Sequence, residues 1–240
     1  MNNTTKFGLP KKVIHCKKCL MTNQKPFSIN ETKNKSGSKK SGLLFNEDGY
    51  CYACVYNEHK NKIDWDLREN KLREMLSKFR KDDGSYDCII SGSGGKDSQF
   101  QAHILKDKYG MNPLTVTWAP HLYTDWGWAN FQAWLNAGFD NQLMTPNPKT
   151  HRLLTRLAVE NLFHPFQPFM LGQKSLAPKF AALFDIPLVF YGENEAEYGN
   201  PLQDNNAAQR DWSYFSATAE SELFLSGTSI TELKEEYGLN

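Results

Sequence analysis

The sequence predicts an α/β fold, in which a parallel sheet carries helices on both faces and a small N-terminal four-cysteine zinc ribbon precedes it. Three observations predict this architecture. Segments typical of buried strands alternate with segments of helical periodicity from about residue 86 onward. A loop rich in glycine and serine, "SGSGGKDS" (91–98), lies at one strand-to-helix junction. Two C-x-x-C pairs lie near the N-terminus.

The two C-x-x-C pairs contain the candidate metal ligands Cys16, Cys19, Cys51 and Cys54, with 31 residues between the pairs. Each pair directs two thiolates toward one ion, so two pairs form a closed tetrahedral site of the kind that holds Zn²⁺. A closed site leaves no position for water or substrate, so we expect it to hold a short segment folded. His15 and His59 flank the cysteines and either replace a ligand or, as we expect, lie on the surface.

The charges divide the chain into two parts. Residues 1–62 carry twelve lysines, no arginine and four acidic residues, a net charge of +8. Residues 63–240 carry sixteen basic and twenty-three acidic residues, a net charge of −7. This change of sign predicts a zinc-binding module over 1–62 and a second domain over 63–240. A basic segment contacts nucleic acid or an acidic partner, or is simply solvated. Its few aromatic residues favour a solvated surface, so a nucleic acid partner is not expected.

Other function classes are excluded by what the sequence lacks. It has no apolar run of about 18 residues and no apolar leader, so we expect no membrane partner and a cytoplasmic location. Residues 99–240 contain no cysteine, which disfavours sulfur transfer. Asn2 follows Met1, and Cys88 is the one cysteine outside the pairs, so we expect no glutaminase within this chain.

The elements follow in order along the second part. A helix over 64–81 begins at Asp64 as its N-cap and presents apolar residues at helical spacing. The predicted strands are 86–91, 113–119, 141–146 and 186–192, and the predicted helices are 97–110, 127–138, 148–163 and 173–184. Cys88 lies inside the first strand and is interpreted as a small buried residue.

The loop after the first strand predicts an anion site, because glycines allow backbone N–H groups to approach phosphate oxygens. A Walker A alignment puts Ile90 at the first glycine position and Asp97 at the Ser/Thr position, so that motif fails. The dinucleotide-binding glycine pattern fails as well, because Asp97 stands at its last glycine. The remaining S-G-G-x-D-S motif, residues 93–98, resembles the PP-loop of the ATP pyrophosphatases, also called adenine nucleotide α-hydrolase-like proteins.

The resemblance implies ATP and Mg²⁺ as cofactors and a role for each loop residue. The backbone amides of Gly94, Gly95 and Lys96, with the hydroxyls of Ser93 and Ser98, hold the departing pyrophosphate. Asp97 acts through Mg²⁺ because a bare carboxylate repels phosphate. The backbone between Val116 and Trp118 contacts the adenine, and Gly172 completes the predicted nucleotide-binding set.

Two further side chains are predicted at the same edge of the sheet. Glu193 opens the acidic segment "GENEAE" after the last strand, where it either binds Mg²⁺ as a catalytic residue or belongs to a solvated loop. Lys174, placed just after a probable strand, either reaches the α-phosphate or is a solvated lysine at a helix start. The aromatic segment 121–131 either lines a sugar site or belongs to the core.

Six segments together resemble the N-acetyl sugar amidotransferases of bacterial surface-glycan pathways. They are "HCKKCLMTNQKP", "DGYCYAC", the helix over 64–81, "SGSGGKDS", "TWAPHLYTDWGWANF" and "FYGENEAEYGNP", spread between about residues 8 and 201. The resemblance implies adenylation of the acetamido oxygen of a nucleotide-linked N-acetyl sugar, followed by attack of ammonia to give an acetamidino sugar. It also implies a separate glutaminase subunit that supplies the ammonia. The substrates include CMP-linked pseudaminic- or legionaminic-type nonulosonates and UDP-linked diacetamido sugars, between which the sequence does not choose.

Two features depart from the pattern of this family. Ser91 and Gly92 precede the motif and double it to "SGSGG", and the family usually runs longer after a C-terminal helix that here opens with a capping box, Ser229 to Glu232. Two other functions stay open. One is adenylation of a tRNA base, with the basic ribbon as the RNA contact, and the other is a non-catalytic subunit that binds adenine nucleotide.

Overall fold

The computed structural model describes residues 3–28, 31–200, 209, 219 and 222–239. They form two compact units. One contains residues 65–156 and 165–193, and the other contains the residues up to 64, residues 157–164 and the described residues from 194 onward. The predicted zinc module, residues 1–62, falls within the second of these two units, which also contains residues 157–164 and the described residues from 194 onward. Its independent folding stays a prediction.

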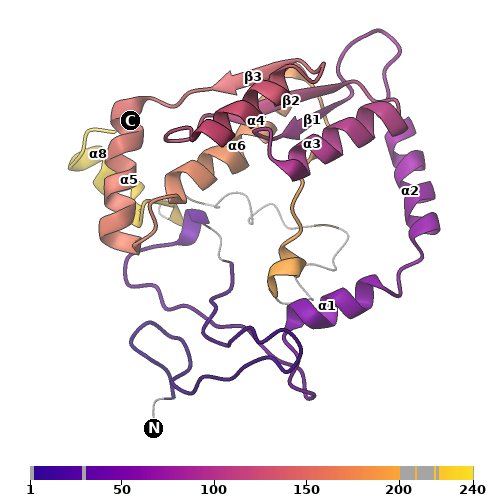
Figure 1. Ribbon diagram of the computed structural model, residues 1–240. Coiled ribbons are helices and arrows are strands. Elements are labelled where there is room, and N and C mark those ends of the chain that lie inside the picture. Colours follow the sequence, from indigo (N-terminus) through magenta and orange to yellow (C-terminus); the bar gives the residue numbers. More distant parts are fainter. Residues whose placement is uncertain (1–2, 29–30, 201–208, 210–218, 220–221, 240) are drawn as a thin grey trace. The chain divides into compact units, whose positions relative to one another are not determined.

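The unit built from residues 65–156 and 165–193 contains a four-stranded parallel sheet. Its strands are β1 (Cys88–Ser91), β2 (Pro113–Trp118) and β3 (Asn141–Met144), which are labelled in Figure 1, and β4 (Val189–Phe190). Their order is β3-β2-β1-β4, and all neighbouring pairs are parallel. This sheet confirms the predicted α/β fold class. The chain runs from β1 outward to β3 and then returns to place β4 on the other side of β1.

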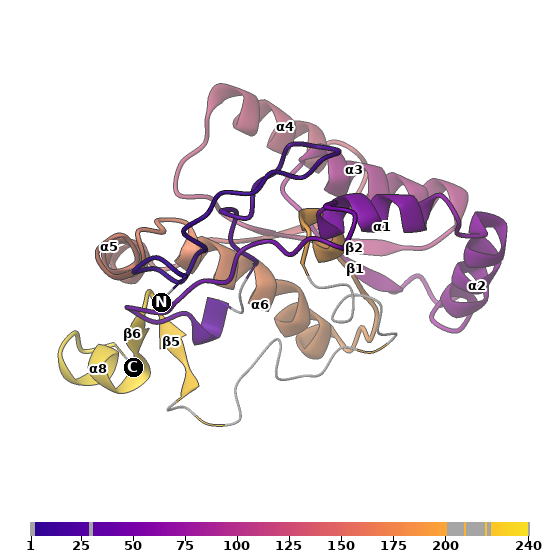
Figure 2. The same cartoon turned by 90° about the horizontal axis from the view of Figure 1, so that it is seen from below.

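Helices cover both faces of this sheet. Figure 2 shows α3 (Lys96–His103) and α4 (Asp125–Leu135) above β1 and β2, and α6 (Gln167–Phe184) below them. Alternate strand residues serve the two faces. Ile90 packs with buried residues of α3 and α4, and with Leu76 of α2 (Trp65–Ser77), whereas Ile89 packs against α6. Because both faces are covered, the strand β1 is apolar at successive positions.

Several predicted bounds shift for local reasons. The helix predicted over 97–110 is α-helical only to His103 and continues as a π-helical turn, η2 (Ile104–Lys108), before Gly110 ends it at φ +63°. The helix predicted from 173 starts six residues earlier, at Gln167, with a proline in its first turn. The strand predicted over 186–192 shortens to β4, because the N–H of Ile186 still bonds to Ala181 O at the end of α6.

The other unit contains short elements around the N-terminal segment. They are η1 (Glu31–Lys33), α1 (Tyr52–Lys60), the end of α5 (Pro148–Leu162), η3 (Glu195–Tyr198), the antiparallel pair β5 (Phe224–Leu225) and β6 (Thr228–Ser229), and α8 (Ile230–Glu235). The Asn161 side chain of α5 donates to Ser226 O and to Thr228 Oγ1. Ser229 Oγ accepts from the N–H of Glu232 at 3.2 Å, which confirms the predicted cap.

Within the described part of the chain, no helix combines the length and the apolar character needed to cross a bilayer.

Candidate functional site

The glycine-rich loop lies where the order of the strands in the sheet reverses. β1 ends at Ser91 and α3 begins at Lys96, so residues 92–95 form the turn at the carboxyl end of an inner strand. The next strand in the chain, β2, lies on one side of β1, and β4 lies on the other. The order of the strands therefore reverses beside β1, and α/β sheets have a ligand-binding crevice at the carboxyl ends of their strands at such a point. The loop occupies the position at which such sheets bind ligands.

The three glycines of the loop have different surroundings. A Cβ at Gly92 would overlap Ser98 Cβ and would lie 2.8 Å from Ser98 Oγ. Gly94 has φ +85°, and a Cβ there would overlap the backbone oxygen of Asn130 in α4. Gly95 has no atom within 4 Å of its Cβ position. Packing therefore requires Gly92 and Gly94, whereas the space beside Gly95 is open. The doubled "SGSGG" follows from the close contact between Gly92 and α3.

The start of α3 carries the predicted ligand-binding side chains. Ser98 is buried, and its hydroxyl donates to Gly95 O at 2.9 Å. Lys96 Nζ lies 2.8 Å from Asp97 Oδ1, and both side chains are exposed. The helix N-terminus and the exposed Lys96 make this position favourable for an anion. The negative charge of Asp97 would repel an anion at this position, which fits a carboxylate that acts through a cation. Ser93, also exposed, completes the predicted set.

Gly192 brings the end of β4 onto α3. Its Cβ position lies 3.4 Å from Asp97 Cβ and 3.1 Å from Gln101 Nε2. Glu193 follows directly in the chain and is exposed. The residue before Glu193 thus packs against Asp97, and the role of both carboxylates as Mg²⁺ ligands stays a prediction.

The predicted position of Lys174 after a strand is wrong. Lys174 lies inside α6, because the residues before it are helical from Gln167. Its backbone lies beside the segment that follows β4, since the Tyr191 hydroxyl donates to Lys174 O at 3.2 Å. Tyr191 and Gly192 thus contact α6 and α3 in turn, immediately before Glu193. Another acidic residue of the segment, Glu197, pairs with Lys60 at 2.5 Å instead.

The backbone of β2 presents polar groups beside the loop. The N–H of Gly92 donates to Val116 O at 3.0 Å, so Val116 directs its backbone groups toward β1. The N–H of Ala119 donates to Met144 O, toward β3. Backbone direction alternates along a strand, so Trp118 directs its N–H and C=O to the same side as Val116. The β1–β2 ladder ends at Ser91 and Val116, so these groups of Trp118 lie beyond the last paired residue of β1.

Gly172 serves packing around the Trp118 side chain. A Cβ at Gly172 would overlap the indole ring. The glycine therefore allows α6 to approach the end of β2. The predicted contact of Gly172 with nucleotide stays a prediction.

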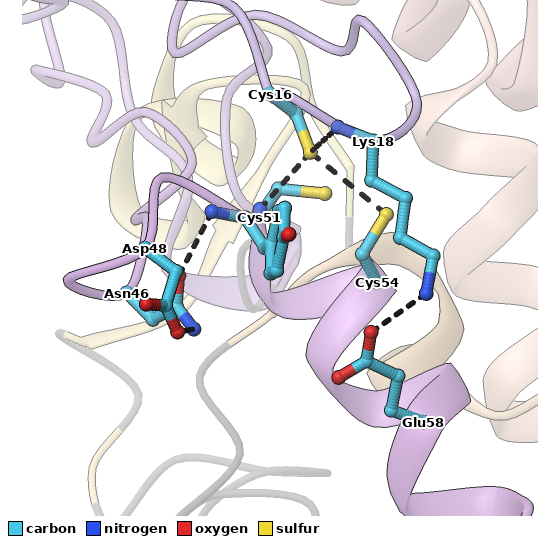
Figure 3. Close-up of polar contacts among 8 residues, drawn as sticks. Cys16, Lys18, Asn46, Asp48, Cys51, Cys54 and Glu58 are labelled. Carbon is cyan, nitrogen blue, oxygen red and sulfur yellow. Dashed lines mark hydrogen bonds and ion pairs between the residues drawn. The ribbon is translucent and has the colours of Figure 1, made fainter.

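The four paired cysteines meet in the other unit. Their sulfur atoms all lie within 4.8 Å of one another. Cys16 Sγ lies 3.8 Å from Cys54 Sγ, and Cys19 Sγ lies 3.6 Å from Cys51 Sγ. A tetrahedral ion with bonds of about 2.3 Å to sulfur would place its ligands about 3.8 Å apart. Figure 3 shows the Cys16 and Cys54 thiols pointing toward one another. The geometry confirms the predicted cluster of four cysteines and fits one tetrahedral metal ion.

Backbone groups favour the thiolate form at one position of this cluster, Cys16. Burial raises the pKa of Cys16, but hydrogen bonds from the backbone N–H groups of Cys19, Cys51 and Lys18 outweigh it and lower this pKa to about 6. Burial and neighbouring thiols raise the pKa of Cys54. Beside the cluster, Lys18 Nζ contacts Glu58 Oε1 at 2.6 Å (Figure 3). A bound cation would compensate the charge of several thiolates held this close together.

Sequence reasoning missed two features of the first unit. Gln101 lies one helical turn after Asp97, and its Nε2 is buried without a partner in the described part of the chain. The spacing of Asp97 and Gln101 is visible in the sequence, but Gly192, which lies next to the Gln101 side chain, is distant along the chain. The second feature is a group of aromatic rings around His121, whose ring centroid lies 4.6 Å from that of His151, and His151 in turn lies 6.3 Å from Trp118.

No family model matches the sequence. An uncharacterized protein of Methanocaldococcus jannaschii is 32% identical over 81 residues, which cover 33% of this chain and 29% of that protein. The match thus spans less than a third of this relative. An NH3-dependent NAD synthetase from Campylobacter jejuni, solved with the nitrate ion, is similar with a TM-score of 0.42 and 17% identity, covering 74% of this chain and 75% of that one. A predicted subunit of tRNA methyltransferase from Methanocaldococcus jannaschii has a TM-score of 0.32 and 18% identity over 64% of each chain.

Proposed function

We propose that the chain is an ATP-dependent, AMP- and pyrophosphate-forming amidotransferase that acts on a nucleotide-linked N-acetyl sugar. The observation that carries the ATP part is the position of S-G-G-x-D-S at the point where the strand order reverses, with the end of β4 packed onto Asp97. A loop of open backbone followed by a helix N-terminus suits pyrophosphate. The sugar part rests on the resemblance of the six sequence segments.

The proposed reaction has two balanced steps. The acetamido oxygen attacks the α-phosphorus of ATP, an O–P bond forms, and the bond to the bridging oxygen breaks to release pyrophosphate. Ammonia then attacks the acetamido carbon, AMP departs with the original oxygen, and one proton is lost. The product is an acetamidino sugar. The amide oxygen is a poor leaving group by itself, and its bond to the α-phosphorus lets it leave as part of AMP.

The charged and polar groups of the site have different roles in this reaction. The N-terminus of α3 and the open backbone at Gly95 bind the departing pyrophosphate. Asp97 and Glu193 hold Mg²⁺, which neutralises phosphate charge when it is bound. Lys174 stabilises the charge that develops on the α-phosphate. The backbone groups of Trp118 beyond the end of β1 contact the adenine.

Zinc is the ion proposed for the cluster of four cysteines. Four thiolates at tetrahedral spacing match the ligand set of structural zinc sites. The site has no open coordination position in this arrangement, so the metal holds the residues around α1 together and takes no part in the reaction. Ammonia comes from a separate glutaminase subunit or from solution, since the chain offers no spare nucleophilic cysteine.

The test combines ATP, Mg²⁺, ammonium and either CMP-linked or UDP-linked N-acetyl sugars, and it measures pyrophosphate and AMP. We expect release that depends on the sugar. The variant Asp97→Asn should lose at least about a hundredfold in rate, as expected when a metal-bound charge is removed from a phosphoryl site. Its circular dichroism should match the unchanged protein, because Asp97 is exposed. Release that needs no sugar, or that persists in Asp97→Asn, contradicts the proposal.

A second function is favoured by the charge of the N-terminal part. Residues 1–62 carry a net charge of +8, which suits the phosphate backbone of RNA. In this alternative, the loop adenylates a tRNA base in place of a sugar amide. Binding of tRNA that weakens steeply with salt, together with tRNA-dependent pyrophosphate release, would select it over the sugar substrate.

A further inference from the structure

An aromatic cluster lies beside the carboxyl end of β2, and its ring side chains have no role in the proposed chemistry. It consists of Trp118, His121, His151, Phe166 and Phe169. The His121 ring centroid lies 4.6 Å from that of His151, 6.1 Å from Phe166 and 5.8 Å from Phe169. Trp118 and His151 are 6.3 Å apart. Three separate segments thus bring five aromatic rings together within one unit.

The cluster lies on the opposite face of the sheet from the contacts of the glycine loop. The Trp118 side chain packs on α6 at Gly172 and belongs to the core between α6 and the sheet. Gly92 of the loop instead contacts Ser98 and Trp134, which belong to the α3 and α4 side. The backbone of Trp118 therefore faces the loop, while its side chain faces away from it. A ligand of the cluster need not compete with a nucleotide held by the loop.

Two nitrogen atoms in the cluster lack partners. Trp118 Nε1 and His151 Nε2 are buried, and neither has a hydrogen-bond partner among the described residues. Burial, followed by the nearby His121, lowers the pKa of His151, so this ring is neutral at pH 7. The indole N–H can only donate, and a neutral imidazole can donate or accept through Nε2. Buried polar groups are normally satisfied, so a ligand group that bonds to one of these two atoms would gain a hydrogen bond that no described residue supplies.

The outer part of the cluster offers ring faces to solvent. Phe166 is 57% exposed and His121 is also exposed. Exposed aromatic faces beside buried N–H groups suit a flat group that stacks and also accepts hydrogen bonds. Nucleobases have this combination, since every base has a π-face and a pyrimidine carries a carbonyl oxygen. An acyclic or fully aliphatic ligand would use only one of the two features.

We propose that this aromatic cluster binds the pyrimidine base of the nucleotide-linked acceptor, which stacks on His121 and Phe166 while a base oxygen accepts from the Trp118 indole. The inference rests on the proposed function for the identity of the acceptor. It adds a base site to that function, whereas the sequence offered the segment 121–131 only as a sugar site or as core. The base of the acceptor and the base of ATP then occupy different faces of the same strand end.

The test measures binding of CMP and UDP by calorimetry while a non-hydrolysable ATP analogue and Mg²⁺ are present at saturating concentration. The analogue occupies the loop, so a pyrimidine nucleotide can bind only elsewhere. We expect one pyrimidine nucleotide to bind, and His121→Ala and Phe166→Ala each to weaken it by about tenfold, the scale of one lost base stack. His103→Ala is the matched control, because this histidine contacts Phe139 and Asp107 outside the cluster. The control should bind as the unchanged protein does.

The outcomes separate this inference from the proposed function. If the analogue binds and no pyrimidine nucleotide does, the inference is wrong and the proposed ATP chemistry stands. If the analogue fails to bind, the proposed function fails, and the pyrimidine titration without it still decides the role of the cluster. Weaker binding of the analogue in His121→Ala and Phe166→Ala, with unchanged pyrimidine binding, would assign the cluster to adenine. Competition by free N-acetylglucosamine would assign it to the sugar. Both results overturn the inference.

Discussion

Gly92, Gly94 and Gly95 are adjacent in the sequence pattern but have different physical roles. Gly92 is fixed by the close approach of Ser98, and Gly94 by its left-handed backbone and the nearby Asn130 oxygen. No atom within 4 Å restricts a side chain at Gly95. A glycine that packing does not require, at the N-terminus of a helix, leaves room for a ligand to approach the backbone.

Alanine substitutions should separate stability from binding in this loop. Gly92→Ala should destabilise the protein by about 1–3 kcal/mol, because the added methyl group must displace Ser98. Gly95→Ala should cost about 1 kcal/mol or less, as a change at a helix N-cap, yet weaken binding of pyrophosphate. Denaturant unfolding and calorimetric titration with pyrophosphate measure the two effects. Equal loss of stability in both variants would contradict the assignment.

At the scale of elements, the unit that contains the described residues up to 64 has a buried cluster made mainly of cysteines. Its buried cluster consists of Cys16, Leu43, Cys51 and Cys54, with four partly buried apolar residues around it. Three of these four buried side chains are thus candidate metal ligands. Cys51 is the N-cap of α1 and Cys54 lies in its first turn, so a bound ion fixes the start of this helix. Few apolar contacts remain to hold the segment if the ion leaves.

Removal of the metal should unfold this region selectively. After chelation we expect fast amide hydrogen exchange over residues 14–54, while β1 and β2 stay protected. Four thiols should become reactive toward a thiol reagent. Cys88 should stay unreactive until the sheet unfolds, because burial raises its pKa to about 12 and it is fully enclosed. Retained protection over 14–54 in metal-free protein would refute the structural role of the ion.

At the scale of the whole molecule, ligand binding and folding are linked. A nucleotide that binds only the folded loop stabilises the folded state by about 2.7 kcal/mol at a hundred times its dissociation constant. An ATP analogue with Mg²⁺ should therefore raise the melting temperature of the chain. Asp97→Asn should lose the part of the shift that depends on Mg²⁺. Thermal scans of both proteins with the analogue, first with Mg²⁺ and then with a chelator that removes it, measure this effect. Identical shifts in both proteins would exclude Asp97 as a metal ligand.

The sequence predicted the elements that rest on local patterns better than those that rest on packing. The order of strands and helices and the cap at Ser229 follow from periodicity and hydrogen-bonding chemistry. The start of α6 was placed too late, because its first turn is rich in apolar residues that also suit a buried strand. Lys174 was therefore placed after a strand that does not form, and it lies within α6 instead.

The S-G-G-x-D-S pattern and the spacing of four cysteines were determined by sequence alone, because the first is a run of six consecutive residues and the second consists of two short C-x-x-C pairs. The tertiary structure decided how distant segments meet. It placed Gly192 on Asp97, showed that Gly92 is required by Ser98 and Trp134, and brought His151 next to both Trp118 and His121. Such contacts depend on the strand order β3-β2-β1-β4, and local periodicity does not specify which side of β1 receives β4.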